Sequence, residues 1–207
     1  MTVVTEPEPT RSMRPSGISS RTPPPAAGVR RALAKGLVSL VLVAGAATLP
    51  CPAKVYMTQD EALAAAFPSG PAPERLTAFL TETQAAEVEK ASGQPLPSRV
   101  ITYYKSTTGS TAWFDTHIVR THPETIMVVV SPAAEVQRID ILSFAEPEEY
   151  LPRARWTEQL HGRKLTDELS LRGGVRPITG ATLTARAIVG AARRVLALHR
   201  TLVAGAP

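Results

Sequence analysis

The chain has 207 residues, enough for one domain with extensions, and 43% of them are hydrophobic, which allows a buried core. Its formal net charge is +5, but the basic residues are scattered and form no stripe, so nucleic-acid binding is not expected. The single cysteine, Cys51, excludes an intrachain disulfide, and with four dispersed histidines it gives no metal-site spacing, so no metal site is expected.

The N-terminal part of the chain has the composition of a disordered tail. Residues 1–29 are rich in Pro, Ser, Thr and Arg and carry almost no large apolar side chains. Such a segment buries too little surface to offset its ordering entropy. We therefore predict a disordered cytoplasmic tail over residues 1–34.

An uncharged run, Gly36–Ala53, follows the tail. As a helix it is about 27 Å long, near the lower limit for crossing a bilayer. The positive-inside rule places the N-terminus in the cytoplasm, because Arg30, Arg31 and Lys35 precede the run. We predict a retained single-pass anchor over residues 35–54 in the lipid bilayer of a bacterial inner membrane, with the remaining chain in the periplasm. A cleaved signal peptide is the alternative, since AGA and CPA offer small-residue cleavage sites.

The remaining residues, 55–207, predict one α+β domain. Helical patterns cover Thr58–Phe67, Thr83–Ala91 and Arg155–His161, and Thr58 forms a capping box with Glu61. Runs rich in β-branched and aromatic residues predict four strands: Arg99–Lys105, Ala112–Val119, Thr125–Ser131 and Val136–Phe144. The last run alternates imperfectly, so we expect a bulge in it.

A C-terminal helix from about Leu183 completes the predicted domain. Its apolar stripe consists of Ile188, Ala191, Val195, Leu198 and Leu202. A stripe of this width can cover a sheet. The expected fold is therefore a small antiparallel sheet packed by helices, preceded by one transmembrane helix.

The start of this helix, Thr179–Ile188 (TGATLTARAI), combines a glycine with two threonines. Gly180 lets the backbone approach a ligand closely, and the free N–H groups and dipole of a helix start favour an anion such as phosphate. Alternatively, Thr182 or Thr184 is an ordinary N-cap, which contributes about 1 kcal/mol. The residues alone leave both interpretations open.

TGATLTA followed by an amphipathic helix resembles the FMN-binding domain family, which includes one component each of the sodium-translocating NADH:quinone reductase and the Rnf complex. The segments MTQDEALAAAFP, WFDTHIVRT and FAEPEEYLPRARW resemble small membrane-anchored members, over roughly residues 55–203. In this family a flavin transferase acting outside the cytoplasm joins FMN through its phosphate to a threonine. The resemblance implies a phosphoester at Thr182. Arg176 departs from the family, which often has Asp at the matching position.

The resemblance and the needs of a flavin together define the candidate cofactor-binding residues. Those of the turn and the helix start are Thr179, Gly180, Ala181, Thr182, Leu183 and Thr184. An isoalloxazine ring needs an apolar or aromatic platform. The candidates for it are Trp113, Phe114, Tyr150, Leu151 and Trp156. Glu146 belongs to the proline-restricted EPEEY loop, which we expect to line the cofactor.

His117 and Arg120 lie on the strand predicted from WFDTHIVR and face opposite sides of it. His117 shares its face with Asp115 and Trp113. His117 and Arg120 can each contact a phosphate or a flavin edge, or can be surface residues without a role.

The sequence shows no nucleophile–base group and no catalytic motif, which favours an electron carrier over a stand-alone enzyme. We expect a membrane-anchored, extracytoplasmic FMN-binding protein that exchanges electrons with a membrane redox complex or another electron-transfer protein. The alternative is an accessory or structural subunit of a larger membrane complex, with FMN absent or non-catalytic. The long tail motivates this alternative, because a simple anchor does not require it.

Overall fold

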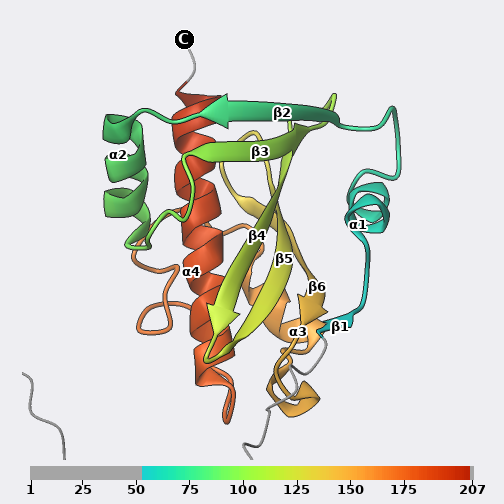
Figure 1. The fold of residues 1–207 in the computed structure, drawn as a ribbon, viewed down its shortest axis with the longest axis vertical. Helices are drawn as coiled ribbons and strands as arrows, with labels where there is room; N and C mark the ends of the chain where they lie inside the picture. The colour runs from blue at the N-terminus through green and yellow to red at the C-terminus, as the bar shows by residue number, and fades with distance from the viewer. Residues whose placement is uncertain (1–52, 206–207) are drawn as a thin grey trace, which may run out of the picture. The chain divides into compact units, whose positions relative to one another are not determined.

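The described part of the chain forms an antiparallel sheet with helices on both faces (Figure 1), which confirms the predicted α+β class. The computed structural model describes residues 53–205. Its strands pair in the order β1-β6-β5-β4-β3-β2, each pair antiparallel. The strands are β1 (Lys54–Val55), β2 (Glu74–Phe79), β3 (Val100–Lys105), β4 (Thr111–Val119), β5 (His122–Val130) and β6 (Val136–Phe144). The α-helices are α1 (Gln59–Ala66), α2 (Glu82–Ser92), α3 (Ala154–Thr157) and α4 (Thr182–His199). Short 3-10 turns cover Glu148–Tyr150 and Glu158–Leu160, and a π-helical turn, Arg200–Ala204, continues α4.

Helix α4 supplies most of the helical side of the core. It runs along β4, β5 and β6, with α2 beside it, while β2 and β3 lie across its C-terminal end (Figure 1). The main core cluster joins α4 residues such as Ile188 and Val195 to Trp113, Ile126 and Val128 of the sheet. The other face of the sheet carries a smaller cluster under α1, formed by Ala62, Leu63, Ala112, Met127, Val129 and Leu142. The predicted stripe is confirmed, since its first four residues are buried and Leu202 is partly buried.

Local hydrogen bonds explain where α1 and α2 begin. The Thr58 side chain accepts from the Glu61 N–H while the Glu61 carboxylate accepts from the Thr58 N–H, so the predicted capping box is confirmed. Thr81 and Gln84 make the same reciprocal pair at the start of α2. Gly93 ends α2 in the left-handed conformation, with φ of 67°. Each box satisfies two of the N–H groups that a helix start leaves without partners.

The strand pairing departs from regularity at two places. Strand β6 is bulged against β5, with register shifts at Thr125/Ile126 and at Val129/Val130, which confirms the expected bulge. Strand β3 pairs with β4 only from Tyr103↔Trp113 to Lys105↔Thr111. The two strands therefore separate beyond Trp113, and the separation leaves room for side chains between β3, β4 and α4.

The remaining differences from the sequence predictions concern β1, β2 and the N-terminal segments. Strand β2 was not predicted, because ERLTAF is short and mostly exposed and is fixed by pairing with β3. The predicted tail, and the predicted anchor up to residue 52, lie outside the described residues. Lys54, the end of the predicted anchor, belongs to β1. Among residues 53–205 there is no helix with the length and apolar character needed to span a bilayer.

Candidate functional site

Neither Thr182 nor Thr184 caps α4, so the N-cap interpretation is wrong. The N-cap residue is Ala181, and no side chain makes a capping hydrogen bond there. Thr182 is exposed on the first helical turn, and its hydroxyl makes only a long bond, 3.4 Å, to the Ile178 carbonyl. Thr184 is buried. The start of this 18-residue helix therefore presents its free N–H groups and the Thr182 hydroxyl without a side-chain acceptor.

Gly180 gives the turn its shape and leaves it accessible. Its φ is 83°, a conformation that favours glycine, and a Cβ built there meets no atom within 4 Å. Thr179 is exposed beside it, whereas Ala181 is buried and anchors the turn to the domain. Leu183 is 43% exposed on the first helical turn. The turn is thus open to an approaching molecule on its outer side.

The EPEEY loop is bound to the β4–β5 turn. The buried Glu146 carboxylate accepts a hydrogen bond from the Thr121 N–H at 3.3 Å and lies 3.2 Å from His122 Nδ1. The Arg120 guanidinium lies over the Tyr150 ring, 4.5 Å from its centroid. Glu146 and Tyr150 are therefore fixed by the hairpin rather than free in a flexible loop.

Helix α3 connects this loop to the segment before the TGAT turn. The Trp156 indole N–H donates to the Arg176 carbonyl at 2.7 Å, and the Arg176 N–H donates to Gln159 Oε1 at 3.0 Å. The Arg176 side chain is exposed. The start of α4, α3 and the ends of β4 and β1 lie at one end of the domain (Figure 1). At this end, Leu151 lines a cavity of about 260 Å³ together with Tyr56, Ile141 and Pro152.

Trp113 lies near the C-terminal end of α4, whereas Thr182 lies at its N-terminal end. It is 2% exposed, stacks on Tyr103 and donates its indole N–H to Thr111 Oγ1, which is 2.9 Å from His199 Nδ1. His199 is 17 residues after Thr182, which is about 25 Å of helix. A flavin phosphate at Thr182 and a ring on Trp113 are therefore incompatible with the fold, and the same separation applies to its strand neighbour Phe114. Of the predicted platform residues, Tyr150, Leu151 and Trp156 belong to the Thr182 end.

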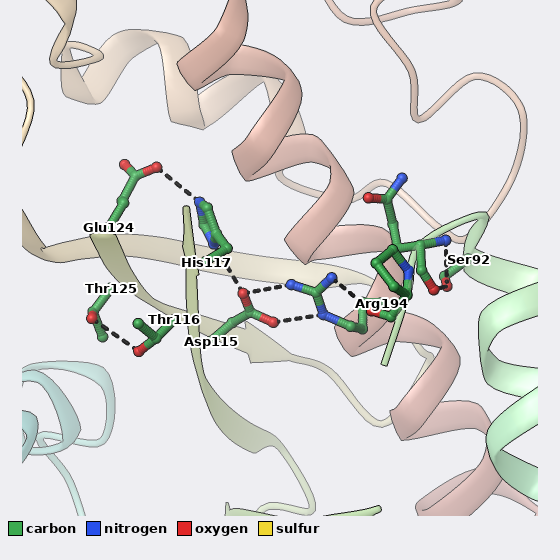
Figure 2. Close-up of polar contacts among 9 residues, drawn as sticks. Ser92, Asp115, Thr116, His117, Glu124, Thr125 and Arg194 are labelled. Atoms are coloured by element: carbon green, nitrogen blue, oxygen red, sulfur yellow. Dashed lines mark hydrogen bonds and ion pairs between the residues drawn. The ribbon is translucent and has the colours of Figure 1, made fainter. Parts of the chain in front are cut away.

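A second constellation, absent from the predicted site, joins β4, β5 and α4 through charged side chains (Figure 2). Arg194 donates two hydrogen bonds to Asp115, from Nε at 2.9 Å and from Nη2 at 2.8 Å, and one from Nη1 to the Pro95 carbonyl. His117 bridges two carboxylates, with Nδ1 2.9 Å from Asp115 and Nε2 2.9 Å from Glu124. We call these four residues the buried charge cluster. His117 is not a surface residue, since only 11% of its side chain is exposed.

The protonation states in the buried charge cluster follow from its contacts. Burial lowers the pKa of His117, but hydrogen bonds to Asp115 and Glu124 outweigh it and raise that pKa from 6.5 to about 9. Burial raises the pKa of Asp115, but His117 and Arg194 outweigh it, so the net direction is downward. Burial dominates at Glu124 and raises its pKa. At neutral pH His117 is therefore a cation between the carboxyl groups of Asp115 and Glu124.

The buried charge cluster connects β4, β5 and α4. Both ring nitrogens of His117 are engaged with carboxylates, and among residues 53–205 no group of three or more His, Cys, Asp or Glu is placed to hold a metal ion. Glu124 is fully buried, and its Oε1 has no hydrogen-bond partner within the same part of the chain. The sequence contained a signal for the buried position of Arg194. This residue is three positions after Ala191 and four before Leu198, so it lies beside the apolar stripe of the helix.

Comparison with known proteins gives no relative: no protein-family model, no curated protein and no solved structure matches this chain. Any function must therefore be argued from the residues and their arrangement.

Proposed function

We propose that this protein is a membrane-anchored, extracytoplasmic electron carrier that binds FMN at the TGAT turn, with the phosphate esterified to Thr182. The observation that carries the proposal is the uncapped start of α4, where Thr182 is exposed and no side chain accepts from the first helical turn. Capping was the competing explanation for these threonines. Without a side-chain cap, the N–H groups at this helix start are available to an anion, which supports a phosphate at the turn.

The residues at this end fit a phosphate and a flavin ring. The helix dipole and the free N–H groups favour a phosphate, and Gly180 leaves space for it. Tyr150, Leu151 and Trp156 supply apolar and aromatic surface on segments that the hairpin and α3 hold in place. When bound, FMN supplies the electron-transfer chemistry. The protein fixes its position and excludes water from part of its surface.

Attachment requires a flavin transferase and an activated flavin nucleotide as co-substrate. Thr182 Oγ1 would form a new P–O bond to the flavin phosphate and lose its proton. The P–O bond between the two phosphates of the donor would break, and the nucleotide monophosphate on its other side would leave. No electrons are exchanged in this step. The exposed hydroxyl of Thr182 is accessible to such an enzyme, whereas the buried Thr184 is not.

The test uses the full chain, expressed with a flavin transferase, exported, purified in detergent and then denatured. We expect intact mass and flavin fluorescence to report one FMN on the Thr182 peptide, and none in Thr182→Ala. Thr179→Ala, an exposed threonine three residues earlier, is the matched control and should keep its flavin. Flavin on the Thr182→Ala chain, or an unmodified wild-type mass, contradicts attachment at Thr182.

Arg176 departs from the family that the motif region resembles, in which Asp is frequent at the matching position. Its guanidinium is exposed, so replacement with Asp disturbs no contact of the domain, since both hydrogen bonds at this position come from the backbone. If the wild-type chain carries no covalent FMN but Arg176→Asp does, the reversed charge prevents recognition by the transferase. FMN binding without a covalent bond then remains the proposal, tested by flavin retention before denaturation.

An accessory subunit without redox function is the second candidate, and one observation favours it. Phe79 and Val100 are paired across β2 and β3 and are 75% and 52% exposed. Such a pair at the β2 edge of the sheet suits contact with another protein. A Phe79→Ser/Val100→Ser chain that keeps its flavin but no longer co-purifies with a membrane complex would show that this surface is a subunit contact.

A further inference from the structure

Three arginines converge on a cavity of about 430 Å³ beside α4. Arg186 and Arg193 come from α4 and Arg172 from the segment before it, and the opposite wall is the end of α2 with Gln94. The described residues that line it include no Asp or Glu. We call this cavity the arginine pocket. Like charges gathered without a counter-charge repel one another, and an anion in the pocket removes that cost.

Arg193 is held rigidly at the pocket. Its Nε donates to the Ser92 carbonyl at 2.9 Å, and its Nη1 donates to the Thr166 carbonyl at 2.6 Å and the Leu169 carbonyl at 3.3 Å. These bonds fix the guanidinium plane without neutralising its charge. The bond from Nε also satisfies the Ser92 carbonyl at the C-terminus of α2. A helix C-terminus carries partial negative charge and by itself disfavours an anion. A fixed guanidinium loses little entropy on binding a phosphate or a carboxylate.

The other two arginines are exposed and free to close on a ligand. Arg172 and Arg186 make no ion pair within residues 53–205. The inner wall is shaped by Gly190, where a Cβ would lie 2.7 Å from Gln94 Oε1, so the Gln94 amide packs directly on the helix backbone. Val189 and Leu171 add apolar surface. The pocket thus combines one fixed cation, two adjustable cations, an amide and an apolar wall.

We propose that the arginine pocket binds a small soluble organic phosphate, with the phosphate between the three guanidinium groups and the organic part against Val189 and Leu171. Two or more negative charges on the ligand match the uncompensated charge of the pocket. The cavity volume exceeds the size of a single phosphate and leaves room for a compact organic group.

This site is separate from the Thr182 turn and does not depend on FMN. Arg186 is one helical turn after Thr182, about 6 Å along the axis, and Thr182 is not among the residues that line the pocket. The test therefore uses the full chain with Thr182→Ala, in which no FMN phosphate is attached. Failure of the FMN proposal leaves this inference intact, and the reverse also holds.

The experiment titrates the detergent-purified Thr182→Ala chain with inorganic pyrophosphate by calorimetry at low salt. We expect a dissociation constant below about 1 mM, weakened about a hundredfold by Arg172→Gln/Arg186→Gln, since a hydrogen-bonded charge contributes about tenfold. The control is Arg75→Gln/Arg153→Gln, which removes the same charge from exposed positions outside the pocket. It should change binding less than about threefold.

Two results overturn the proposal. One is no heat of binding with the Thr182→Ala chain, and the other is equal weakening in the pocket and control variants, which would indicate non-specific attraction to a basic protein. Arg172 and Arg186 are exposed, and their variants should melt at the same temperature as the parent chain. Arg193 is left unchanged because its loss would free three backbone carbonyls.

Discussion

His117 makes the stability of the domain depend on pH, and the size of the effect follows from its contacts. Asp115 and Glu124 raise the pKa of His117 from 6.5 to about 9 against the opposing effect of burial. The folded state therefore holds this proton more tightly than the unfolded state. The difference between the two pKa values, about 2.5 units, corresponds to about 3–4 kcal/mol at about 1.4 kcal/mol for each pKa unit.

The sign of the effect follows from the raised pKa. Its contribution to the free energy of unfolding is complete below pH 6.5, declines as pH rises, and is lost above about pH 9. Removing the titrating group with His117→Gln should therefore flatten the pH profile between these values. The variant is also expected to be less stable at pH 6, because Glu124 loses its partner in a buried site.

The assay is urea unfolding of the wild-type and His117→Gln chains at intervals from pH 6 to pH 10. We expect the stability difference between them to shrink by about 3–4 kcal/mol across this range. His122→Gln is the matched control, a histidine 37% exposed on β5 whose loss leaves the contacts of His117 intact. Its profile should fall as the wild-type profile does. Parallel profiles for the wild type and His117→Gln would refute the assigned charge on His117.

Other changes test further elements of the fold. Asp115→Ala leaves the buried Arg194 without its carboxylate and should cost about 3–5 kcal/mol in urea unfolding, whereas a loss below about 1 kcal/mol would mean that water reaches the guanidinium. Thr81→Ala breaks the capping box with Gln84 and should cost about 1 kcal/mol, and Thr81→Ser should restore most of it. Gly180→Ala forces a side chain into φ of 83° and should lower Tm by about 2–4 °C; an unchanged Tm would show that the turn relaxes.

Much of the secondary structure could be predicted, because its causes are local. The Thr58–Glu61 box marks the start of α1, and four strands and the stripe of α4 follow from periodicity. Strand β2 escaped prediction because pairing with β3, not its own pattern, makes it a strand. The helix start at Thr182 was predicted almost to the residue, but its cap was not. Capping depends on the direction of side chains in the turn, which spacing does not specify.

Except for β1 and β2, the sequence by itself determined the elements. It also determined the polar turn before α4 and the faces of the predicted strands and of α4, because these depend on residues three or four apart or on simple alternation. Only the tertiary structure decided which polar residues meet. Arg194 contacts Asp115 across 79 positions, and Arg193 contacts Ser92 across 101. Such contacts depend on how α4 lies on the sheet, and a rotation of the helix about its axis would bring different residues together. The same placement put Trp113 at the far end of α4 from Thr182 and gathered the arginine pocket.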